Sequence, residues 1–371
     1  MNILNYKTFV IKIGSSLIVD GKNKIKTKWF KNLVDDIIFL NNKSKRVIIV
    51  SSGAIALGCD LLKIKKKKIK LGQFQAIAAV GQIELINFFK IHFQRKKKNI
   101  SQILLTLDDT EDRRRSLNAK ETINHLLNMG VIPVVNENDT VATEEIRYGD
   151  NDRLAARVAQ ICNADCLVML SDVEGLYSKD PKKNKDAKII TKVSEIDHSI
   201  ERLATKSVSD YGSGGMITKI KAAKICMQSG CDMILTSGKI NNPIKNLIKN
   251  TNFTVFESNS STLSAKKQWI LNSIATKGSL VIDEGAEKAL KNKKSLLPVG
   301  VKEVNGDFKR GDSVNVLNQS NEKIATGIVA YSSDEAKKII GLKTEKIEEI
   351  LGHASRGEMV HIDNLVYQKT K

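Results

Sequence analysis

Residues 9–16 read FVIKIGSS, an apolar run that ends in a glycine and two serines. Residues 47–53, VIIVSSG, follow the same order of apolar and then small polar residues. Short runs of this kind, rich in β-branched residues, are typical of buried strands. Four more runs of the same character are residues 103–107, 131–135, 166–170 and 233–236.

Segments with a helical spacing of apolar residues lie between the predicted strands. They are residues 27–40, 74–93, 116–129, 151–162 and 217–229. Strands that alternate with helices predict an α/β fold, in which a mainly parallel sheet is sandwiched between helices.

The pattern changes after about residue 265. Glycines separate short alternating runs such as residues 313–317 and 324–330, which favours β-structure. We therefore predict an α/β domain over residues 1–265, a linker over residues 266–277 and a small β-rich domain over residues 278–371.

Composition places the chain among folded, water-soluble proteins. It has 371 residues, of which 41% are hydrophobic and 27% charged, enough for two or three domains. The net charge of +19 is a feature of many nucleic-acid-binding proteins. However, residues 278–371 carry only +1 of it, and the rest includes short lysine runs at residues 65–68 and 96–98. We attribute this excess to an AT-rich coding sequence and expect no nucleic-acid partner.

Cysteines and apolar segments indicate a reducing cytoplasm and no membrane. No stretch reaches the ~18 uninterrupted apolar residues of a membrane helix, and the first residues do not resemble a signal peptide. The five cysteines lack the spacing of a zinc ribbon, and the five histidines show no metal-ligand spacing. We predict buried free thiols.

Small polar residues follow four of the predicted strands. In parallel α/β sheets, ligands bind where the strands end at their carboxyl edge. Turn chemistry could explain any one of these segments, but four together predict a single binding crevice. The segments are residues 14–16, 51–53, 136–139 and 171–172.

Two other segments stand at predicted helix starts. Residues 213–219, SGGMITK, run into a helix, and such a junction offers backbone N–H groups and the positive helix end to phosphate. This segment matches neither a Walker A loop nor G-x-G-x-x-G. Residues 149–152, GDND, open another helix, where the carboxylates could cap the helix or orient cations. The sequence leaves both interpretations open.

These motifs resemble the amino acid kinase family, and within it the members that phosphorylate the side-chain carboxylate of L-glutamate. The resemblance spans essentially the whole chain, because two C-terminal segments are similar to the PUA domain that many bacterial members carry. The kinase segments are KIGSS (12–16), SSGAIA (51–56), PVVNEND (133–139), GDND (149–152), SDVEGLY (171–177) and GGMITK (214–219). The PUA-like segments are VIDEGA (281–286) and SLLPVGV (295–301).

The resemblance implies a phosphotransferase with a carboxyl group as acceptor. ATP, with Mg²⁺, would convert L-glutamate to gamma-glutamyl phosphate in the first step of proline biosynthesis. The labile product would pass to gamma-glutamyl phosphate reductase. A homo-oligomer, dimer or tetramer, is also implied, with proline feedback near the glutamate site. The residue types agree with this chemistry, because a glutamate carboxylate, with a pKa of about 4.3, is already ionised and needs no general base.

The resemblance also implies roles for individual residues. The expected catalytic residues are Lys12, Lys219, Asp150 and Asp152, the two carboxylates orienting the lysines or the magnesium-bound phosphates. ATP would contact Lys12, Gly14, Ser171, Asp172, Ser213, Gly214, Gly215, Met216, Ile217, Thr218 and Lys219. Glutamate would contact Ser52, Gly53, Asn136, Asp139 and Asn151. Mg²⁺ would be held mainly by the phosphates of ATP rather than directly by the protein.

Other functions agree less well with the sequence. Aspartokinase, acetylglutamate kinase and uridylate kinase use related sites, but the PUA-like tail and residues 136–139 and 149–152 argue against them. From a different class, the chain could be an RNA-binding protein, since PUA domains occur in such proteins and the pI is about 9.5. The nearly neutral tail and the lack of clustered aromatic residues for base stacking count against that function.

Overall fold

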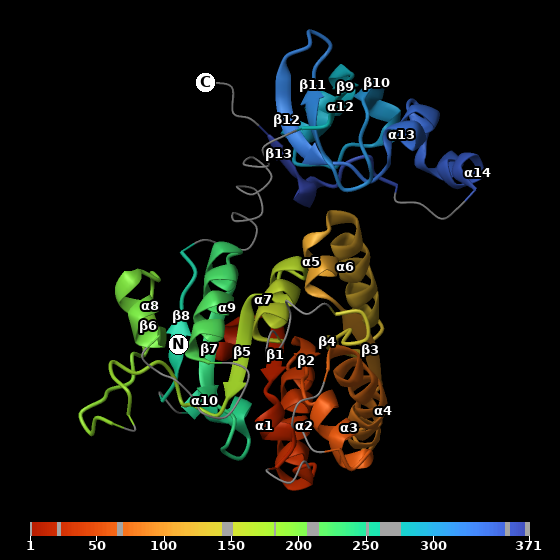
Figure 1. The fold of residues 1–371 in the computed structure, drawn as a ribbon. Helices are drawn as coiled ribbons and strands as arrows, with labels where there is room; N and C mark the ends of the chain where they lie inside the picture. The colour runs from red at the N-terminus through yellow and green to blue at the C-terminus, as the bar shows by residue number, and fades with distance from the viewer. Residues whose placement is uncertain are drawn as a thin grey trace. The chain divides into compact units, whose positions relative to one another are not determined.

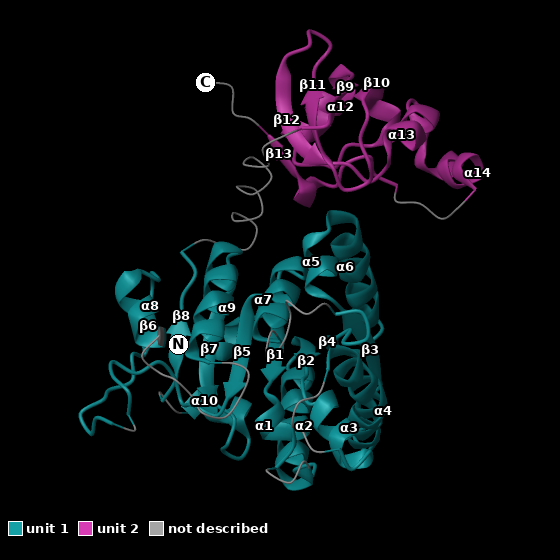
Figure 2. Cartoon of the chain, viewed as in Figure 1, with its two compact units in different colours: residues 1–262 teal, residues 263–371 magenta. Residues whose placement is uncertain are grey.

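The computed structural model describes residues 2–20, 24–64, 70–142, 151–181, 183–205, 215–249, 252–259, 276–352 and 357–367. The chain divides into two compact units, residues 1–262 and 263–371 (Figures 1 and 2). Most of the predicted linker, residues 266–275, lies outside the described residues. The boundaries predicted at residues 265 and 278 therefore stay predictions.

The first unit is built on an eight-stranded sheet with the order β3-β4-β2-β1-β5-β7-β8-β6. The first six strands in that order pair in parallel, whereas β8 is antiparallel to β7 and parallel to β6. The predicted, mainly parallel sheet is thus confirmed. The strands are β1 (Thr8–Ile13), β2 (Arg46–Val50), β3 (Ile100–Leu105), β4 (Ile132–Glu137), β5 (Cys166–Ser171), β6 (Lys192–Val193), β7 (Asp232–Ser237) and β8 (Thr254–Phe256).

Helices cover both faces of this sheet (Figure 1). One apolar cluster joins a sheet face to α1, α2, α3, α4 and α10, and a second joins the other face to α5 through α9. Successive residues of β1 alternate between the clusters, as the two-residue period of a strand requires. The helices are α1 (Ser15–Ile18), α2 (Thr27–Asn42), α3 (Ala54–Leu61), α4 (Leu71–Gln94), α5 (Leu107–Glu111), α6 (Arg113–Asn128), α7 (Asn151–Ile161), α8 (His198–Thr205), α9 (Met216–Gln228) and α10 (Pro243–Lys249).

The strand predicted at residues 103–107 was misplaced. The observed β3 begins three residues earlier and ends at Leu105, because Thr106 caps α5 instead of continuing the strand. Its hydroxyl accepts a hydrogen bond from the Asp109 backbone N–H at 3.2 Å, and the Asp109 carboxylate accepts one from the Thr106 N–H at 2.8 Å. This capping box fixes the start of the helix. The short strands β6 and β8 and the short helices were not predicted.

Two glycines bring α3 and α4 into backbone contact. A Cβ at Gly81 of α4 would lie 1.8 Å from the Ala54 carbonyl oxygen of α3. A Cβ at Gly58 of α3 would lie 2.0 Å from the Ile77 carbonyl oxygen of α4. Only glycine permits such an approach. Because α3 directly follows β2, this contact fixes α4 beside the carboxyl end of that strand.

The second unit contains a five-stranded sheet with the order β10-β9-β11-β12-β13. Neighbouring strands are antiparallel except β9 and β11, which pair in parallel. A small β-rich unit, as predicted, is therefore present. Its elements are β9 (Gly278–Ile282), α12 (Glu284–Lys291), β10 (Val301–Gly306), β11 (Ser313–Leu317), β12 (Lys323–Ile328), α13 (Ser333–Ile339), α14 (Ile347–Leu351) and β13 (Leu365–Tyr367).

Two other predictions can be compared with the structure. All five cysteines are buried free thiols, as predicted. Among the described helices, α4 is long and apolar enough to cross a membrane, but half of its apolar window is buried inside the first unit. That burial is what a core helix of a folded unit shows.

Candidate active site

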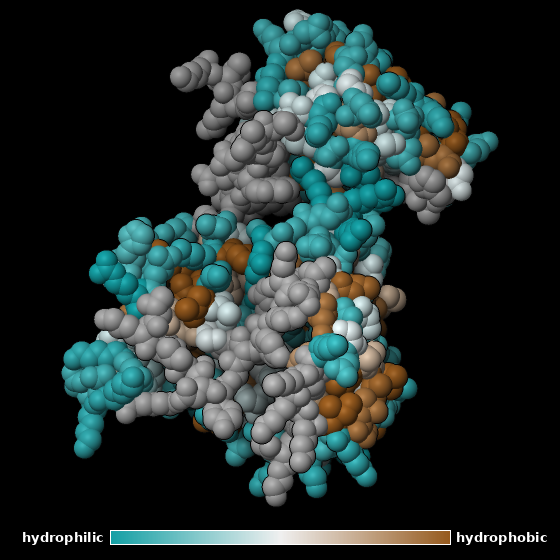
Figure 3. All heavy atoms as spheres, in the orientation of Figure 1, coloured by the Kyte–Doolittle hydropathy of each residue, from teal (hydrophilic) through white to brown (hydrophobic). Residues whose placement is uncertain are grey.

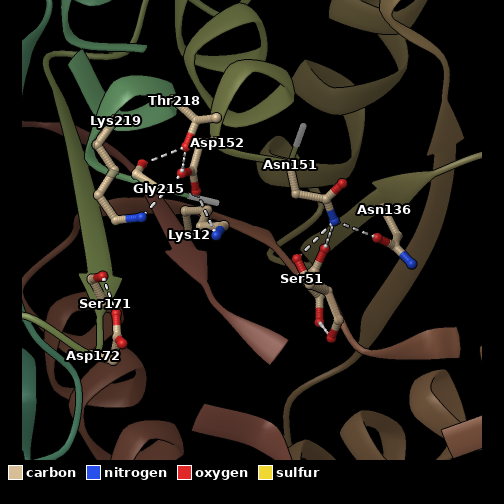
Figure 4. A network of polar contacts seen from close by, with 11 residues as sticks. Lys12, Ser51, Asn136, Asn151, Asp152, Ser171, Asp172, Gly215, Thr218 and Lys219 are labelled. Atoms are coloured by element: carbon tan, nitrogen blue, oxygen red, sulfur yellow. Dashed lines mark hydrogen bonds and ion pairs between the residues drawn. The ribbon is translucent and has the colours of Figure 1, made fainter. Parts of the chain in front are cut away.

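Polar side chains gather at the carboxyl ends of the central strands (Figure 4). They come from β1, β4 and β5, from the residues after β2, from α4, and from the first turns of α7 and α9. The central strand β1 has β2 on one side and β5 on the other, and the chain changes direction of winding there. This is the position at which open α/β sheets bind ligands. The side chains form two separate clusters.

The first group, which we call the charged cluster, consists of Lys12, Asp152, Thr218, Lys219 and the backbone of Gly215. The Lys12 Nζ lies 2.5 Å from Asp152 Oδ1, and the Lys219 Nζ lies 3.3 Å from Asp152 Oδ2. The Thr218 hydroxyl donates to Asp152 Oδ2 at 2.8 Å and also lies 2.8 Å from the Gly215 carbonyl oxygen. One carboxylate thus holds two lysines from distant parts of the chain.

Burial and charge act in opposite directions on Asp152. The side chain is fully buried, which by itself raises the pKa of its carboxyl. Attraction to Lys12 and Lys219, with the hydrogen bonds that Lys12 and Thr218 donate, outweighs burial and lowers the pKa to about 2. Asp152 is therefore ionised at neutral pH, and it holds the two ammonium groups in place.

The first turn of α9 supplies one side of the charged cluster. The helix begins at Met216, with Gly215 in an extended conformation just before it, so the first backbone N–H groups of α9 lie beside Lys219. A helix N-terminus with an adjacent lysine suits phosphate oxygens. Ser213 and Gly214 lie outside the described residues.

The second group, which we call the amide cluster, consists of Ser51, Ser52, Asn136, Asn151 and Gln82. The two N–H groups of Asn151 Nδ2 are shared among three acceptors, the Ser51 carbonyl oxygen at 2.5 Å, Ser52 Oγ at 2.8 Å and Asn136 Oδ1 at 2.9 Å. The Asn136 Nδ2 donates to Gln82 Oε1 at 2.6 Å. All five side chains of this group are neutral, and the group is held together by hydrogen bonds.

Adjacent residues of α7 belong to different clusters. Asn151 reaches the amide cluster, and Asp152 reaches the charged cluster (Figure 4). The two side chains leave the start of one helix in different directions. The distance between the clusters is therefore fixed by two consecutive residues of α7. Asp150, the other predicted carboxylate of this segment, lies outside the described residues.

The backbone conformation at position 53 requires glycine. It stands between Ser52 and α3 with a φ of +112°, in the left-handed region that other residues rarely adopt. This turn ends β2 and starts α3 at once. The conformation keeps Ser52 at the strand end, where its hydroxyl meets Asn151.

The predicted residues on β5 and after β1 lie at the edge of the charged cluster. Ser171 ends β5, is buried, and donates from its hydroxyl to Asp172 Oδ1 at 3.1 Å. Gly14 follows β1, and a Cβ there would lie 3.9 Å from the Lys12 Nζ. Met216 and Ile217 belong to the first turn of α9, where Ile217 is exposed.

Asp139 has an unusual environment for a carboxylate. It follows β4 in a turn, and burial raises the pKa of its carboxyl to about 6. A positive charge beside this carboxyl would lower its pKa and stabilise its ionised form.

Gln82 was not among the predicted site residues. It lies on α4 among Ala78, Gly81 and Leu85, at the helical spacing that buries one face. A glutamine on an otherwise apolar face was the signal that could have revealed it, because buried amides need partners. Asn136 and Glu137 also belong to β4 itself rather than to the loop after it.

Comparison with known families agrees with the fold and the motifs. The profile of the amino acid kinase family matches residues 7–237, well over half of the chain. The chain belongs to the amino acid kinase family. A PUA domain profile matches residues 278–351. The resemblance inferred from the motifs is thus confirmed for both parts.

Individual relatives match along nearly the full chain. The glutamate 5-kinase of Pelagibacter ubique is 52% identical over 366 residues, which cover 99% of this chain and 100% of the relative. The glutamate 5-kinase of Allorhizobium ampelinum is 47% identical over 98% of this chain and 93% of its own length. A solved UMP kinase from Bacillus anthracis has 16% identity and a TM-score of 0.49, covering 69% of this chain and 97% of its own.

Proposed function

We propose that this amino acid kinase transfers the γ-phosphate of ATP to the side-chain carboxylate of L-glutamate, forming gamma-glutamyl phosphate. The observation that carries the proposal is the pair of clusters at the start of α7. One cluster is cationic and suits phosphates, and the other is neutral and suits a small polar acceptor. The relatives that match nearly the full chain are glutamate 5-kinases, which supports glutamate as the acceptor.

The charged cluster is the proposed phosphate site. Lys12 and Lys219 both lie on Asp152, so their ammonium groups are held close together before ATP binds. Positive groups fixed in advance stabilise the charge that spreads over the γ-phosphate during transfer. Gly14 and the first turn of α9, with Ser213 to Thr218, complete the proposed cradle. Ser171 and Asp172 lie beside the nucleotide in this proposal.

The amide cluster is the proposed glutamate site. Ser52 and Asn151 contact each other there, and Asn136 supports Asn151. Asp139, whose pKa is raised by burial, would face the ammonium group of glutamate. The attacking oxygen of the substrate is an ionised carboxylate, so this chain needs no general base for the step. Positioning by both clusters is therefore the main contribution of the protein.

Mg²⁺ enters this proposal with ATP. Asp152 already contacts two lysines and a threonine, so it is better suited to orient cations than to ligate a metal. When bound, Mg²⁺ would neutralise phosphate charge, and the protein would hold the phosphates through Lys12 and Lys219.

We also propose that the protein is a cytoplasmic homo-oligomer. It would act in proline biosynthesis and pass its product to gamma-glutamyl phosphate reductase. Hydrophobic side chains gather on the surface over α3 and α4 (Figure 3). Ile83 is 71% exposed there, and Leu61, Leu62 and Val80 are exposed as well. Such a patch is common at protein interfaces, and size-exclusion chromatography with light scattering would give the number of copies.

The decisive experiment compares acceptors. ADP release with Mg²⁺ and ATP is measured for glutamate, aspartate, N-acetylglutamate and UMP, and hydroxylamine traps any acyl phosphate. Of the four acceptors, we expect only glutamate to cause ADP release, and we expect glutamyl hydroxamate to form in that reaction. Release that depends on another acceptor, or that needs none, would contradict the proposal.

A further inference from the structure

Gln82 connects the core helix α4 to the amide cluster. Its side chain is buried, and its Oε1 accepts a hydrogen bond from the Asn136 Nδ2 at 2.6 Å. The preceding residue, Gly81, is the one that contacts the backbone of α3. The position of Gln82 is therefore fixed by the direct backbone contact between α3 and α4.

The direction of each hydrogen bond in the amide cluster follows from one fixed acceptor. The Ser51 backbone carbonyl can only accept, so the atom of Asn151 that faces it must be the amide nitrogen. That nitrogen also faces Asn136, which must therefore present its oxygen. The Asn136 nitrogen consequently faces the other way, toward the oxygen of Gln82. The three amides form a chain with one allowed orientation.

This orientation determines which groups remain for a ligand. Because its nitrogen is used, Asn151 turns its oxygen away from Ser51 and Asn136, as Figure 4 shows. Ser52 accepts from Asn151, so its own hydroxyl hydrogen points elsewhere and can be donated. The cluster thus presents an acceptor at Asn151 and a donor at Ser52. An α-amino acid carries the complementary pair, an ammonium donor and a carboxylate acceptor.

We propose that Gln82 is a positioning residue for glutamate, which acts by accepting a hydrogen bond from Asn136 and so holding the Asn136 amide in the orientation that the Ser51 carbonyl requires. The inference rests on the proposed function of the amide cluster as the glutamate site. Gln82 itself touches no substrate. Without the Gln82 oxygen, the Asn136 amide loses its hydrogen-bond acceptor. If the Asn136 amide then rotated by half a turn, its nitrogen would face the nitrogen of Asn151.

Two substitutions separate this role from a packing role. Gln82→Met keeps the length of the side chain but removes the acceptor oxygen, whereas Gln82→Glu keeps an acceptor toward the Asn136 nitrogen. We expect Gln82→Met to raise KM for glutamate about tenfold, the order of effect of one unpaired buried amide. Its kcat and its KM for ATP should stay within about twofold of wild type. Gln82→Glu should restore most of the affinity for glutamate.

The matched control is Gln94→Met, because Gln94 is an exposed glutamine at the end of the same helix. It should leave all three constants unchanged. A wild-type KM for glutamate in Gln82→Met would overturn the inference and leave the proposed function intact. Equal losses in Gln82→Met and Gln82→Glu would also overturn it, since the acceptor oxygen that Gln82→Glu retains would then not account for the affinity for glutamate.

A second readout does not depend on the substrate. The side-chain amide protons of Asn136 and Asn151 can be followed by NMR in ¹⁵N-labelled protein and assigned with single Asn→Asp variants. We expect slow exchange in wild type and in Gln82→Glu, and fast exchange of the Asn136 signal in Gln82→Met. If the Asn136 signal is unchanged in Gln82→Met, the inference fails, even if the enzyme acts on an acceptor other than glutamate.

Discussion

The charged cluster and the amide cluster start from neighbouring residues of α7 but are stabilised differently. In the charged cluster, two nearly buried ammonium groups flank one buried carboxylate, so the cluster carries a net positive charge, and removal of Asp152 would leave both lysines without this carboxylate. In the amide cluster, neutral groups determine the direction of hydrogen bonds and add no charge. The difference indicates that the first cluster sets rate and the second sets recognition, and each prediction below tests that division.

The largest expected effect is on the charged cluster. Lys219→Ala should lower kcat by roughly two to three orders of magnitude, because it removes one charge donor fixed in advance beside the transferring phosphate. KM for glutamate should change little. Steady-state kinetics measure both, with Lys221→Ala, an exposed lysine on the same helix, as control. Turnover near that of wild type would exclude Lys219 from the mechanism.

A change of pH should next affect Asp139, at the proposed glutamate site, but not Asp152 of the charged cluster. The pKa of Asp152 is lowered to about 2, so its carboxylate stays ionised throughout the range from pH 5 to pH 8. The pKa of Asp139 is raised to about 6, and its protonated form cannot bind an ammonium group as an ion pair. Below pH 6, KM for glutamate should therefore rise by up to about tenfold per pH unit. KM for ATP should not follow this trend.

The variant Asp139→Asn tests whether Asp139 causes the predicted pH dependence of KM for glutamate. It should raise KM for glutamate at pH 8 and remove the dependence on pH near 6. The linked effect on folding has the opposite sign to that of a salt-bridged carboxylate. Since the folded-state pKa of Asp139 lies above its unfolded value, unliganded protein should lose stability as pH rises from about 4 to 6 and then level off. A variant that keeps the wild-type pH profile would show that another group titrates.

Gly81→Ala tests the packing that supports the amide cluster. The added Cβ would lie 1.8 Å from the Ala54 carbonyl oxygen, so α3 and α4 must separate. We expect the free energy of unfolding to fall by about 3 kcal/mol, at the upper end of overpacking effects. Denaturant titration measures this, and KM for glutamate should rise more than KM for ATP. Gly72→Ala is the control, because a Cβ there meets no atom within 4 Å.

Prediction from sequence succeeded where the signal was local. The apolar runs and the helical periodicity located five of the six long strands and the long helices, because burial on both faces of a sheet leaves a pattern in neighbouring residues. The strand at residues 103–107 was misplaced because Thr106 resembles a strand residue but caps a helix. The approach of α4 to α3 depends on two glycines 23 positions apart and leaves no periodic signal.

In the candidate site, too, the features that could be predicted were those with a local signal in the sequence. Strand ends with small polar residues could be recognised individually, and the segment 149–152 was open to two interpretations. The structure shows Asp152 in contact with Lys12 and Lys219, which are far from it in sequence. Gln82 was missed because its partner, Asn136, lies 54 residues away. Contacts over such distances cannot be read from one sequence without a fold.

The smallest expected effect comes from the second unit. Residues 1–276 alone should retain glutamate-dependent ATP turnover within about twofold, because every residue of both clusters lies in the first unit. Inter-domain contacts within a chain are usually modest. The kinetics of this truncation against the full chain measure the effect. A folded truncation without turnover at saturating substrates would show that residues 277–371 contribute to the site.

The division between the clusters is tested most directly by two neighbouring substitutions, Asn151→Ala and Asp152→Asn, assayed side by side with glutamate and ATP varied in turn. We predict that Asn151→Ala raises KM for glutamate at least tenfold with KM for ATP within about twofold. We predict that Asp152→Asn lowers kcat about a hundredfold or more and weakens ATP binding, with KM for glutamate nearly unchanged. Similar losses for both substrates in both variants would contradict the account, because one undivided site would then serve glutamate and ATP together.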